Sequence, residues 1–441
     1  MKYCKSKFFL IILVCSFSLF GVSGTERIGR NVKIRGRGVC YMDPGITPEK
    51  ASLIAKYDAL NDILSTAGSY FERNDSLLNE KMRRNQIALI LGNNLDIFIY
   101  REGEENLDGY PTYTSYVTAE INIDNLNRNI LEANTDNHKR YILRSEKRRL
   151  DTLFGKIKSM GLTTSRVSQE FIDDLISKLT ATEWANKANR EKSEGIRMDY
   201  FLIALDYDIR YEAAYLGLAD TMIRIGRYTD LLNKLTSILI ADPLNFPALY
   251  AKRGEVFLNL KQYNSAITEL EKAIAMAPDY ADAYCLLARA HSETGNNSAA
   301  LTRYVQAIKA DGNFYKPFFQ RAILFRKEGK YDDALRDLDN AVNLNPMNAV
   351  TFFNRGIVLY FMGNLERAAE EFSKAIFLDE LTADFFFNRA LVYRKLNMMR
   401  RATDDYRTYL LLTQQKLSRE SYAELVEKWM DNENIVPLFL E

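Results

Sequence analysis

The sequence predicts a mainly α protein, in which stacked helical hairpins form an α-α superhelix after a small α+β domain. Two observations predict this fold class. Small and aromatic residues recur every 34 residues over the second half of the chain, and an alternating segment precedes an alanine-striped segment near the N-terminus. A repeat of roughly 20–50 residues is typical of stacked-repeat proteins, and strands mixed with one helix are typical of a small α+β sandwich.

Two series of small residues define the repeat. The first is Gly254, Ala288, Ala322, Gly356 and Ala390, and the second is Ala266, Ala300, Ala334, Ala368 and Ala402. Aromatic residues stand four positions before the first series, at Tyr250, Tyr284, Phe318, Phe352 and Phe386. Small residues let helix backbones approach and large rings fill the space beside them. We therefore expect each unit to be a pair of antiparallel helices, with its turn at Gly295, Gly329 or Gly363.

This spacing resembles the tetratricopeptide repeat (TPR) family, with units at 247–280, 281–314, 315–348, 349–382 and 383–416. An earlier unit near 212–245 completes six repeats over 212–416, although Leu231 and Ile238 replace its two helix-B alanines. Residues 168–211 predict a degenerate helical repeat or cap, and 417–441 predict a capping helix and tail. The resemblance implies a non-enzymatic scaffold that binds proteins or peptides in the groove of its superhelix.

The resemblance also implies that one face of the first helix of each pair lines that groove. Phe319, Phe353 and Phe387 recur at such a position, and Asn354 and Asn388 follow the last two. The same face carries Tyr360, Arg326, Lys327, Arg394 and Lys395. Exposed rings beside hydrogen-bond donors suit peptide recognition. The alternative is that the phenylalanines pack against the preceding helix.

Some family members bind a C-terminal carboxylate with lysine and asparagine at set groove positions. Lys316 and Asn354 occupy two of these positions, whereas Gln320 and Asp384 stand where an asparagine and a lysine are expected. An acidic residue there disfavours a carboxylate ligand. The sequence therefore predicts peptide binding without a complete carboxylate clamp.

Residues 25–130 predict the small α+β domain. Residues 31–41 alternate as in a half-buried strand, Thr47-Pro48 begins a helix that runs to about Ala67, and two more strands follow near 86–101 and 112–123. Gly36-Arg37-Gly38, the alanine stripe and the strand after Tyr116 resemble the N-terminal domain of flagellar assembly protein T and of small outer-membrane lipoproteins. That resemblance implies an envelope-associated structural role.

Residues 131–167 predict a polar helical connector with a basic run, His138-Lys139-Arg140, Arg144 and Lys147-Arg148-Arg149. Such a run can contact anionic lipid or nucleic acid. A solvated helix face with Glu146 and Asp151 as local partners is the favoured interpretation. The formal net charge of +1 gives no reason to expect nucleic-acid binding, and peripheral membrane association stays open.

Residues 1–24 predict a signal peptide. Lys2, Lys5 and Lys7 precede an apolar core from Phe8 to Phe20, and Val22-Ser23-Gly24 supplies small residues at a cleavage site. We expect cleavage near Gly24 and an extracytoplasmic protein, periplasmic or envelope-associated. A lipid anchor on Cys15 is the alternative, although Cys15 lies inside the apolar core.

The sequence predicts no enzyme, cofactor or metal site. Only two histidines occur, His138 and His291, and no phosphate loop, dinucleotide fingerprint or metal-ligand spacing is found. Cys40 and Cys285 lie in different predicted domains, so buried thiols are favoured over a disulfide. Two other functions stay open: a structural subunit of a cell-envelope or motility assembly, and an enzyme in the N-terminal domain.

Overall fold

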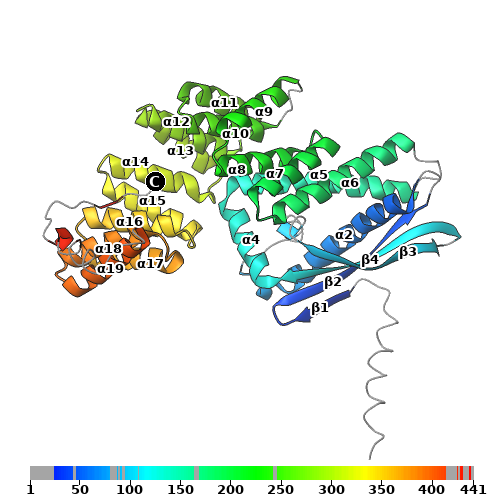
Figure 1. Cartoon of the computed structure of the whole chain (residues 1–441), viewed down its shortest axis with the longest axis horizontal. Coiled ribbons are helices and arrows are strands. Elements are labelled where there is room, and N and C mark those ends of the chain that lie inside the picture. Colours follow the sequence, from blue (N-terminus) through cyan, green and yellow to red (C-terminus); the bar gives the residue numbers. More distant parts are fainter. Residues whose placement is uncertain are drawn as a thin grey trace, which may run out of the picture. The chain divides into compact units, whose positions relative to one another are not determined.

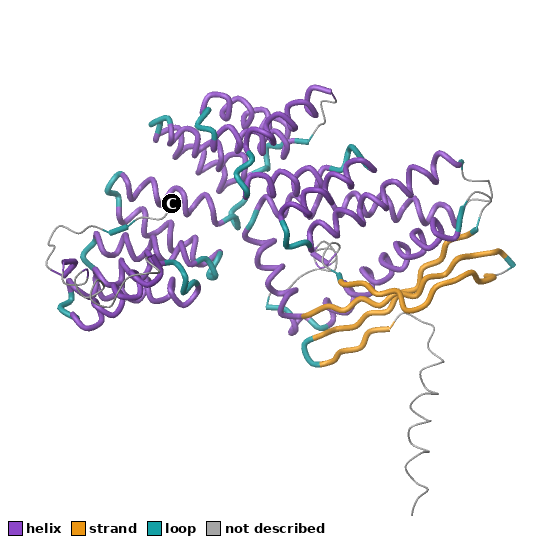
Figure 2. The backbone as a smooth tube through the Cα atoms, viewed as in Figure 1, coloured by secondary structure: helices purple, strands orange, loops and turns teal. Residues whose placement is uncertain are grey.

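The computed structural model describes residues 24–42, 46–79, 87, 90–91, 95–107, 109–162, 168–241, 246–413, 425, 428–430 and 437–438. Residues 1–23 of the predicted signal peptide and most of the predicted C-terminal cap lie outside these residues. The chain divides into two compact units: unit 1 is 1–133 with 139–227, and unit 2 is 134–138 with 228–441. The molecule is mainly helical, with one small antiparallel sheet in its N-terminal part, as predicted (Figures 1 and 2).

The sheet of unit 1 has the strand order β1-β2-β4-β3 among the described residues. Its strands are β1 (Gly24–Ile28), β2 (Asn31–Tyr41), β3 (Asp96–Leu107) and β4 (Tyr110–Asn122), all in antiparallel pairs. The strand expected near 86–101 begins only at Asp96, while Ile87, Ile90 and Leu91 have helical backbone. That prediction was misplaced because a short apolar run fits a strand and a buried helix equally well.

Helix α2 (Pro48–Arg73) packs on one face of this sheet (Figure 1). The Thr47 hydroxyl accepts a hydrogen bond from the N–H of Lys50 and caps the helix, as its Thr-Pro sequence predicts. The helix lies very close to β2, because a Cβ atom at Gly38 would stand 1.9 Å from the carbonyl oxygen of Ala55. Glycine at position 38 is therefore needed for this contact.

The rest of unit 1 is helical. It comprises the short 3-10 helix η1 (Asp75–Leu77), α4 (Ile123–Thr135), α5 (Asn137–Leu162), α6 (Gln169–Arg190), α7 (Glu194–Tyr207) and α8 (Glu212–Arg224), except that residues 134–135 of α4 and 137–138 of α5 group with unit 2. The basic run of α5 is partly buried: Arg149 pairs with Asp208 at 3.0 Å and lies over the ring of Tyr211. Lys147 pairs with Asp151 at 2.5 Å, as expected, whereas Glu146 accepts a hydrogen bond from the Tyr211 hydroxyl.

Unit 2 is a row of helical hairpins. After α9 (Tyr228–Ala241) come α10 (Pro247–Asn259) with α11 (Tyr263–Met276), α12 (Ala281–Glu293) with α13 (Asn297–Ala310), α14 (Tyr315–Lys327) with α15 (Tyr331–Leu344), α16 (Ala349–Phe361) with α17 (Leu365–Leu378), and α18 (Ala383–Lys395) with α19 (Met399–Thr413). Each hairpin contacts the next one. The 34-residue spacing therefore corresponds to one helix pair, as predicted.

The turn inside each hairpin requires a left-handed residue at one fixed position. Gly295, Gly329 and Gly363 have φ near +80°, at 80°, 74° and 81°. The same position in the first and last of the five hairpins holds Lys261 and Asn397, with φ of 59° and 57°. Glycine adopts this conformation without a steric cost, whereas a lysine adopts it at a steric cost.

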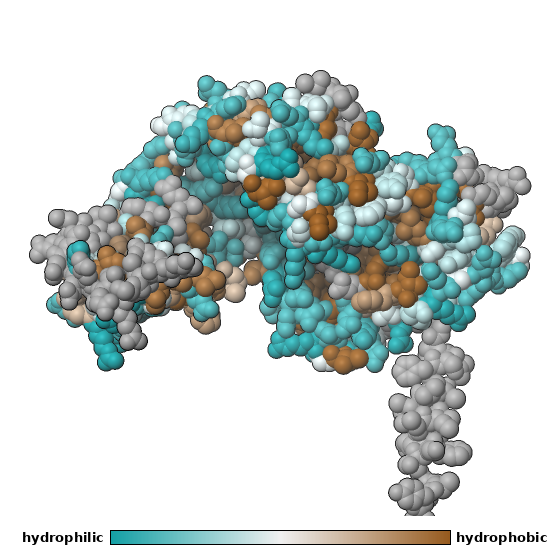
Figure 3. Space-filling model, in the orientation of Figure 1, coloured by the Kyte–Doolittle hydropathy of each residue, from teal (hydrophilic) through white to brown (hydrophobic). Residues whose placement is uncertain are grey.

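No helix in the described part of the chain is both long and apolar enough to cross a lipid bilayer. On the face visible in Figure 3, hydrophilic and hydrophobic residues are mixed.

Candidate functional site

The first helices of the hairpins, α10, α12, α14, α16 and α18, form the candidate site, because the sequence predicts that they line a groove. Each contacts the first helix of the next hairpin. Residues of the first small-residue series lie where the two helices of a hairpin cross. A Cβ atom at Gly254 would approach the Leu270 side chain to 2.7 Å, and one at Gly356 would approach the Phe372 ring to the same distance.

Two of the three predicted groove phenylalanines are buried in the core. Phe353 has no exposed surface, and its ring contacts those of Phe372 and Phe385. Phe387 is 8% exposed and lies against Tyr406 and Tyr409. The expectation that these rings are exposed is wrong. Phe353 is covered by its own hairpin and the next one, and Phe387 by the second helix of its own hairpin. Phe319 is partly buried against the cluster around Leu338.

The two predicted groove asparagines are also buried, each at 1% exposure. The Nδ2 of Asn354 donates to the carbonyl of Val350 at 3.0 Å, and the Nδ2 of Asn388 donates to the carbonyl of Asp384 at 2.8 Å. Both bonds stay within one helix. The two amides therefore occupy equivalent positions in consecutive hairpins, and each donates to the carbonyl four residues earlier in its own helix.

Tyr360 and Lys395 come together from two consecutive hairpins. The Lys395 ammonium lies 4.5 Å from the centre of the Tyr360 ring. Phe361 contacts Tyr360 edge to face and stacks on Tyr331, with centroids 5.5 Å and 5.6 Å apart. Phe361 is 41% exposed, and Lys395 is exposed. We call Tyr331, Tyr360, Phe361 and Lys395 the aromatic cluster.

The other predicted cations are dispersed. Arg394 lies over the Trp429 ring at 5.2 Å and donates to its carbonyl at 2.6 Å, so it serves packing at the C-terminal end of unit 2. Arg326 is buried at 8% exposure, and Lys327 is exposed at the end of α14. The structure therefore does not gather these three into one patch.

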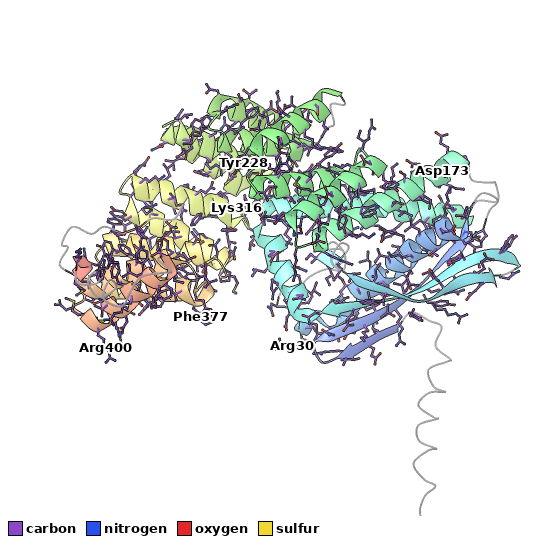
Figure 4. All side chains as sticks on the ribbon, viewed as in Figure 1. Arg30, Asp173, Tyr228, Lys316, Phe377 and Arg400 are labelled. Carbon is purple, nitrogen blue, oxygen red and sulfur yellow. The ribbon has the colours of Figure 1, made fainter. Side chains whose placement is uncertain are left out.

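Lys316 lies in a polar group that the sequence did not predict. Its Nζ is 3.6 Å from the Oδ2 of Asp136. Burial opposes its charge, yet Asp282 and Asp136 hold the pKa of Lys316 above the ordinary lysine value. Lys316 is labelled in Figure 4. Asn137 and His138, next to Asp136, also contact the hairpins of unit 2.

Sequence reasoning missed Asp136 and Asn137 because their partners are far away in the chain. The hairpin involved does depart from the repeat at one position. Arginine recurs at Arg253, Arg321, Arg355 and Arg389, but the corresponding residue of the α12–α13 hairpin is Leu287. That hairpin alone departs from the arginine series among the five.

Cys40 and Cys285 are buried, and burial raises the pKa of the Cys285 thiol, which disfavours a reactive thiolate. A cavity of about 270 Å³ in unit 1 is lined by Glu146, Tyr211, Arg197 and Arg224 among others. Among the residues that the structure describes, no three His, Cys, Asp or Glu side chains are placed to hold a metal ion.

Comparisons with known proteins agree with this geometry. Family models described as "TPR repeat" match residues 254–295 and 322–363, and models described as "Tetratricopeptide repeat" match 281–314 and 353–414. The chain carries tetratricopeptide repeats. The resemblance of the N-terminal domain to flagellar assembly protein T stays a prediction.

Curated relatives match over short stretches. The Hsp70-Hsp90 organizing protein of Triticum aestivum is 26% identical over 20% of this chain and 15% of its own length. The DnaJ homolog subfamily C member 7 of Homo sapiens is 30% identical over 29% of each chain. Protein bimA of Emericella nidulans is 26% identical over 24% of this chain and 13% of its own. The chain thus spans less than a third of the length of these relatives.

Several solved structures are similar to part of this chain. MamA is 17% identical, with a TM-score of 0.34 over 37% of this chain and 95% of its own. YrrB, described as a TPR protein with an unusual peptide-binding site, is 19% identical, with a TM-score of 0.35 over 44% and 97%. A tetratricopeptide repeat protein from Parabacteroides merdae is 17% identical, with a TM-score of 0.41 over 57% and 99%.

Proposed function

We propose that this protein is a non-enzymatic scaffold that binds protein or peptide partners through its tetratricopeptide repeats. The repeats themselves support a protein-binding role. The observation that carries the proposal is the aromatic cluster, which places exposed ring surface beside an exposed lysine across three consecutive hairpins. Aromatic rings supply much of the binding energy in protein interfaces, and the nearby ammonium favours an acidic segment in the partner.

The aromatic cluster can be tested in the full chain by replacing Tyr360 and Phe361 with alanine. Tagged protein is cross-linked to its neighbours in native cells, purified through the tag and compared with the double variant. The matched control is Phe377→Ala, which removes an 89% exposed ring from α17 (Figure 4).

We expect the captured partner to be reduced at least roughly tenfold by the double variant, since one or two central aromatic residues commonly contribute 2 kcal/mol or more, about thirtyfold in affinity. The Phe377→Ala control should capture as much as the wild type. Equal capture by all three proteins would remove the aromatic cluster from the binding surface. No captured protein above the tag background would contradict the scaffold function.

We further propose that the protein acts outside the cytoplasm, with envelope components as partners. Support comes from the sequence of residues 1–24, which has the charged start, apolar core and small residues of an export signal. N-terminal sequencing of the protein from its native cells tests this location. A mature start near Thr25 in an extracytoplasmic fraction is expected, whereas an intact Met1 in the cytosolic fraction would contradict it.

A further inference from the structure

Five residues of the N-terminal connector belong to the repeat unit. Residues 134–138 group with unit 2, although the chain on both sides of them, 1–133 and 139–227, groups with unit 1. Thr135, Asn137 and His138 are buried, at 5%, 9% and 8% exposure. The partners of Asn137 and His138 in the repeats lie 142 to 174 residues later in the sequence. We call residues 134–138 the inserted segment.

Asn137 caps the helix α12 from a distance. The N-cap residue before that helix, Tyr280, provides no side-chain cap, and the Oδ1 of Asn137 accepts a hydrogen bond from the N–H of Asp282 at 3.2 Å. The first N–H groups of a helix have no partner within the helix, so an outside asparagine stabilises them. The Nδ2 of Asn137 donates to the Oδ2 of Asp311 at 2.9 Å, so one carboxamide uses both its acceptor and its donor.

The residues on either side of Asn137 add two more contacts. The carboxylate of Asp136 lies 3.6 Å from the Lys316 ammonium at the start of α14. The Nδ1 of His138 lies 2.8 Å from the Tyr280 hydroxyl oxygen, and this contact is buried. Three consecutive side chains thus contact Tyr280, Asp282, Asp311 and Lys316, which we call the acceptor site.

The acceptor site has the properties of a peptide-recognition site. It combines a cation for a carboxylate, a helix N-terminus for a carbonyl oxygen, and a carboxylate for an amide N–H₂. All four groups come from two adjacent hairpins, α12–α13 and α14–α15. None of them belongs to the aromatic cluster, so the two surfaces can be altered separately.

We propose that the inserted segment is an internal ligand of the acceptor site, and that a partner segment with an aspartate followed by an asparagine displaces it. This inference rests on the proposed peptide-binding function and names a second site for it. The internal segment competes at an effective concentration on the order of millimolar, so it holds the site closed against weak peptides.

The test uses the full chain and a fluorescent peptide with the sequence of residues 131–141, LEANTDNHKRY. Peptide binding is measured by anisotropy to the wild type and to an Asp136→Ala/Asn137→Ala variant, which lacks the internal carboxylate and carboxamide. A peptide with alanine at both of those positions is the matched control ligand. Circular dichroism and thermal unfolding establish that the variant is folded.

We expect the double variant to bind the peptide at least tenfold more tightly than the wild type, and the alanine peptide to bind neither. Adding Lys316→Glu to the double variant should remove the gain. A folded double variant that binds the peptide no better than the wild type would overturn the inference, as would binding that ignores Lys316→Glu.

A second measurement covers the case in which the double variant does not fold. The exchanged pair Asp136→Lys/Lys316→Asp keeps an ion pair at this place, whereas Asp136→Lys alone sets two cations against each other and leaves Lys316 able to bind the peptide. The single variant should increase peptide access and the exchanged pair should restore the wild-type value. Equal peptide binding by both would overturn the inference. Partner capture through Tyr360 and Phe361 is unaffected by either result, so the two proposals fail separately.

Discussion

Arg321 and Asp337 form a paired ionic contact between the two helices of one repeat. The guanidinium Nε and Nη2 lie 2.7 Å from Oδ2 and 2.7 Å from Oδ1 of the carboxylate, and only 6% of the Asp337 side chain is exposed. Arg389 and Asp405 repeat the same geometry. Arg355 with Glu371, and Arg253 with Glu269, occupy the same places in two other hairpins. The α12–α13 hairpin has Leu287 and Arg303 instead.

Replacing Arg321 with leucine should destabilise unit 2 by about 3 kcal/mol, because Asp337 would remain buried and unpaired. The double variant Arg321→Leu/Asp337→Leu should recover most of that loss, since two apolar side chains remove the buried charge altogether. Urea unfolding followed by circular dichroism measures both changes. The control Arg336→Leu breaks an exposed pair with Asp333 and should have little effect. A single variant as stable as the double one would contradict this account.

Replacing Lys261 with glycine should stabilise the repeats by about 1 kcal/mol. Lys261 has φ of 59°, where a side chain is strained, while three other hairpins have glycine at this position. The backbone bonds from Lys261 to Leu258 and from Gln262 to Phe257 show that the turn itself is already complete. Thermal unfolding checks the gain. The converse change Gly295→Lys should lower stability. An increase in stability in that variant would show that a lysine is not strained at this positive φ.

The helix pairs could be predicted from sequence because their contacts are local. Gly356 meets Phe372 sixteen residues later, and the same combination of small and large residues recurs at Gly254 and Leu270. Every such contact joins two residues of the same 34-residue repeat, so both partners recur in the sequence at that spacing. The burial of Phe353 was not predictable in this way, because Phe385 of the next hairpin covers it. Whether a helix face lines the groove or is buried against a neighbour depends on how two consecutive repeats stack.

The acceptor site and strand β1 had no usable sequence pattern. Asp136 and Asn137 stand in a polar helical stretch, and nothing there indicates partners near Asp311 and Lys316. Strand β1 has only five residues, GTERI, with no alternation long enough to read. It is defined by pairing with β2 and not by its own residues.

Replacing Gly38 with alanine should destabilise unit 1 by about 3 kcal/mol. The new Cβ would meet backbone atoms of Ala55 and Ala59, which cannot rotate away, so α2 must move off the sheet. Urea unfolding of the full chain measures the loss. The matched control is Gly103→Ala in β3, where no atom lies within 4 Å of the added Cβ. Equal effects at the two glycines would contradict the close contact between β2 and α2.

Replacing Asp58 with asparagine should stabilise unit 1 at neutral pH. Burial, with a smaller effect of Asp62, raises the pKa of Asp58 in the folded protein, while its Oδ2 accepts the N–H of Val39 at 2.9 Å. The folded state therefore binds more protons than the unfolded state between the ordinary aspartate pKa of about 3.9 and the raised value, so stability falls as the pH rises through that window.

An asparagine keeps the hydrogen-bond acceptor for Val39 and carries no charge at any pH. Its advantage over Asp58 should be largest at pH 7, should shrink as the pH falls through the raised pKa of Asp58, and should be lost below about pH 4. Urea unfolding at both pH values measures it, with the exposed Asp333→Asn as control. The same advantage at both pH values would show that the buried charge of Asp58 is not its cause.

Replacing Phe353 with alanine should destabilise the α16–α18 region by about 4 kcal/mol, because it leaves a cavity between the rings of Phe372 and Phe385. Repeat proteins unfold locally, so the measurement is amide hydrogen exchange in α16, α17 and α18. The control Phe377→Ala removes an exposed ring of the same size and should leave exchange unchanged. Unchanged protection in the Phe353 variant would restore this ring as a candidate for the binding surface. With the expected loss, weaker partner capture by that variant would report damaged packing, whereas Tyr360 and Phe361 test binding directly.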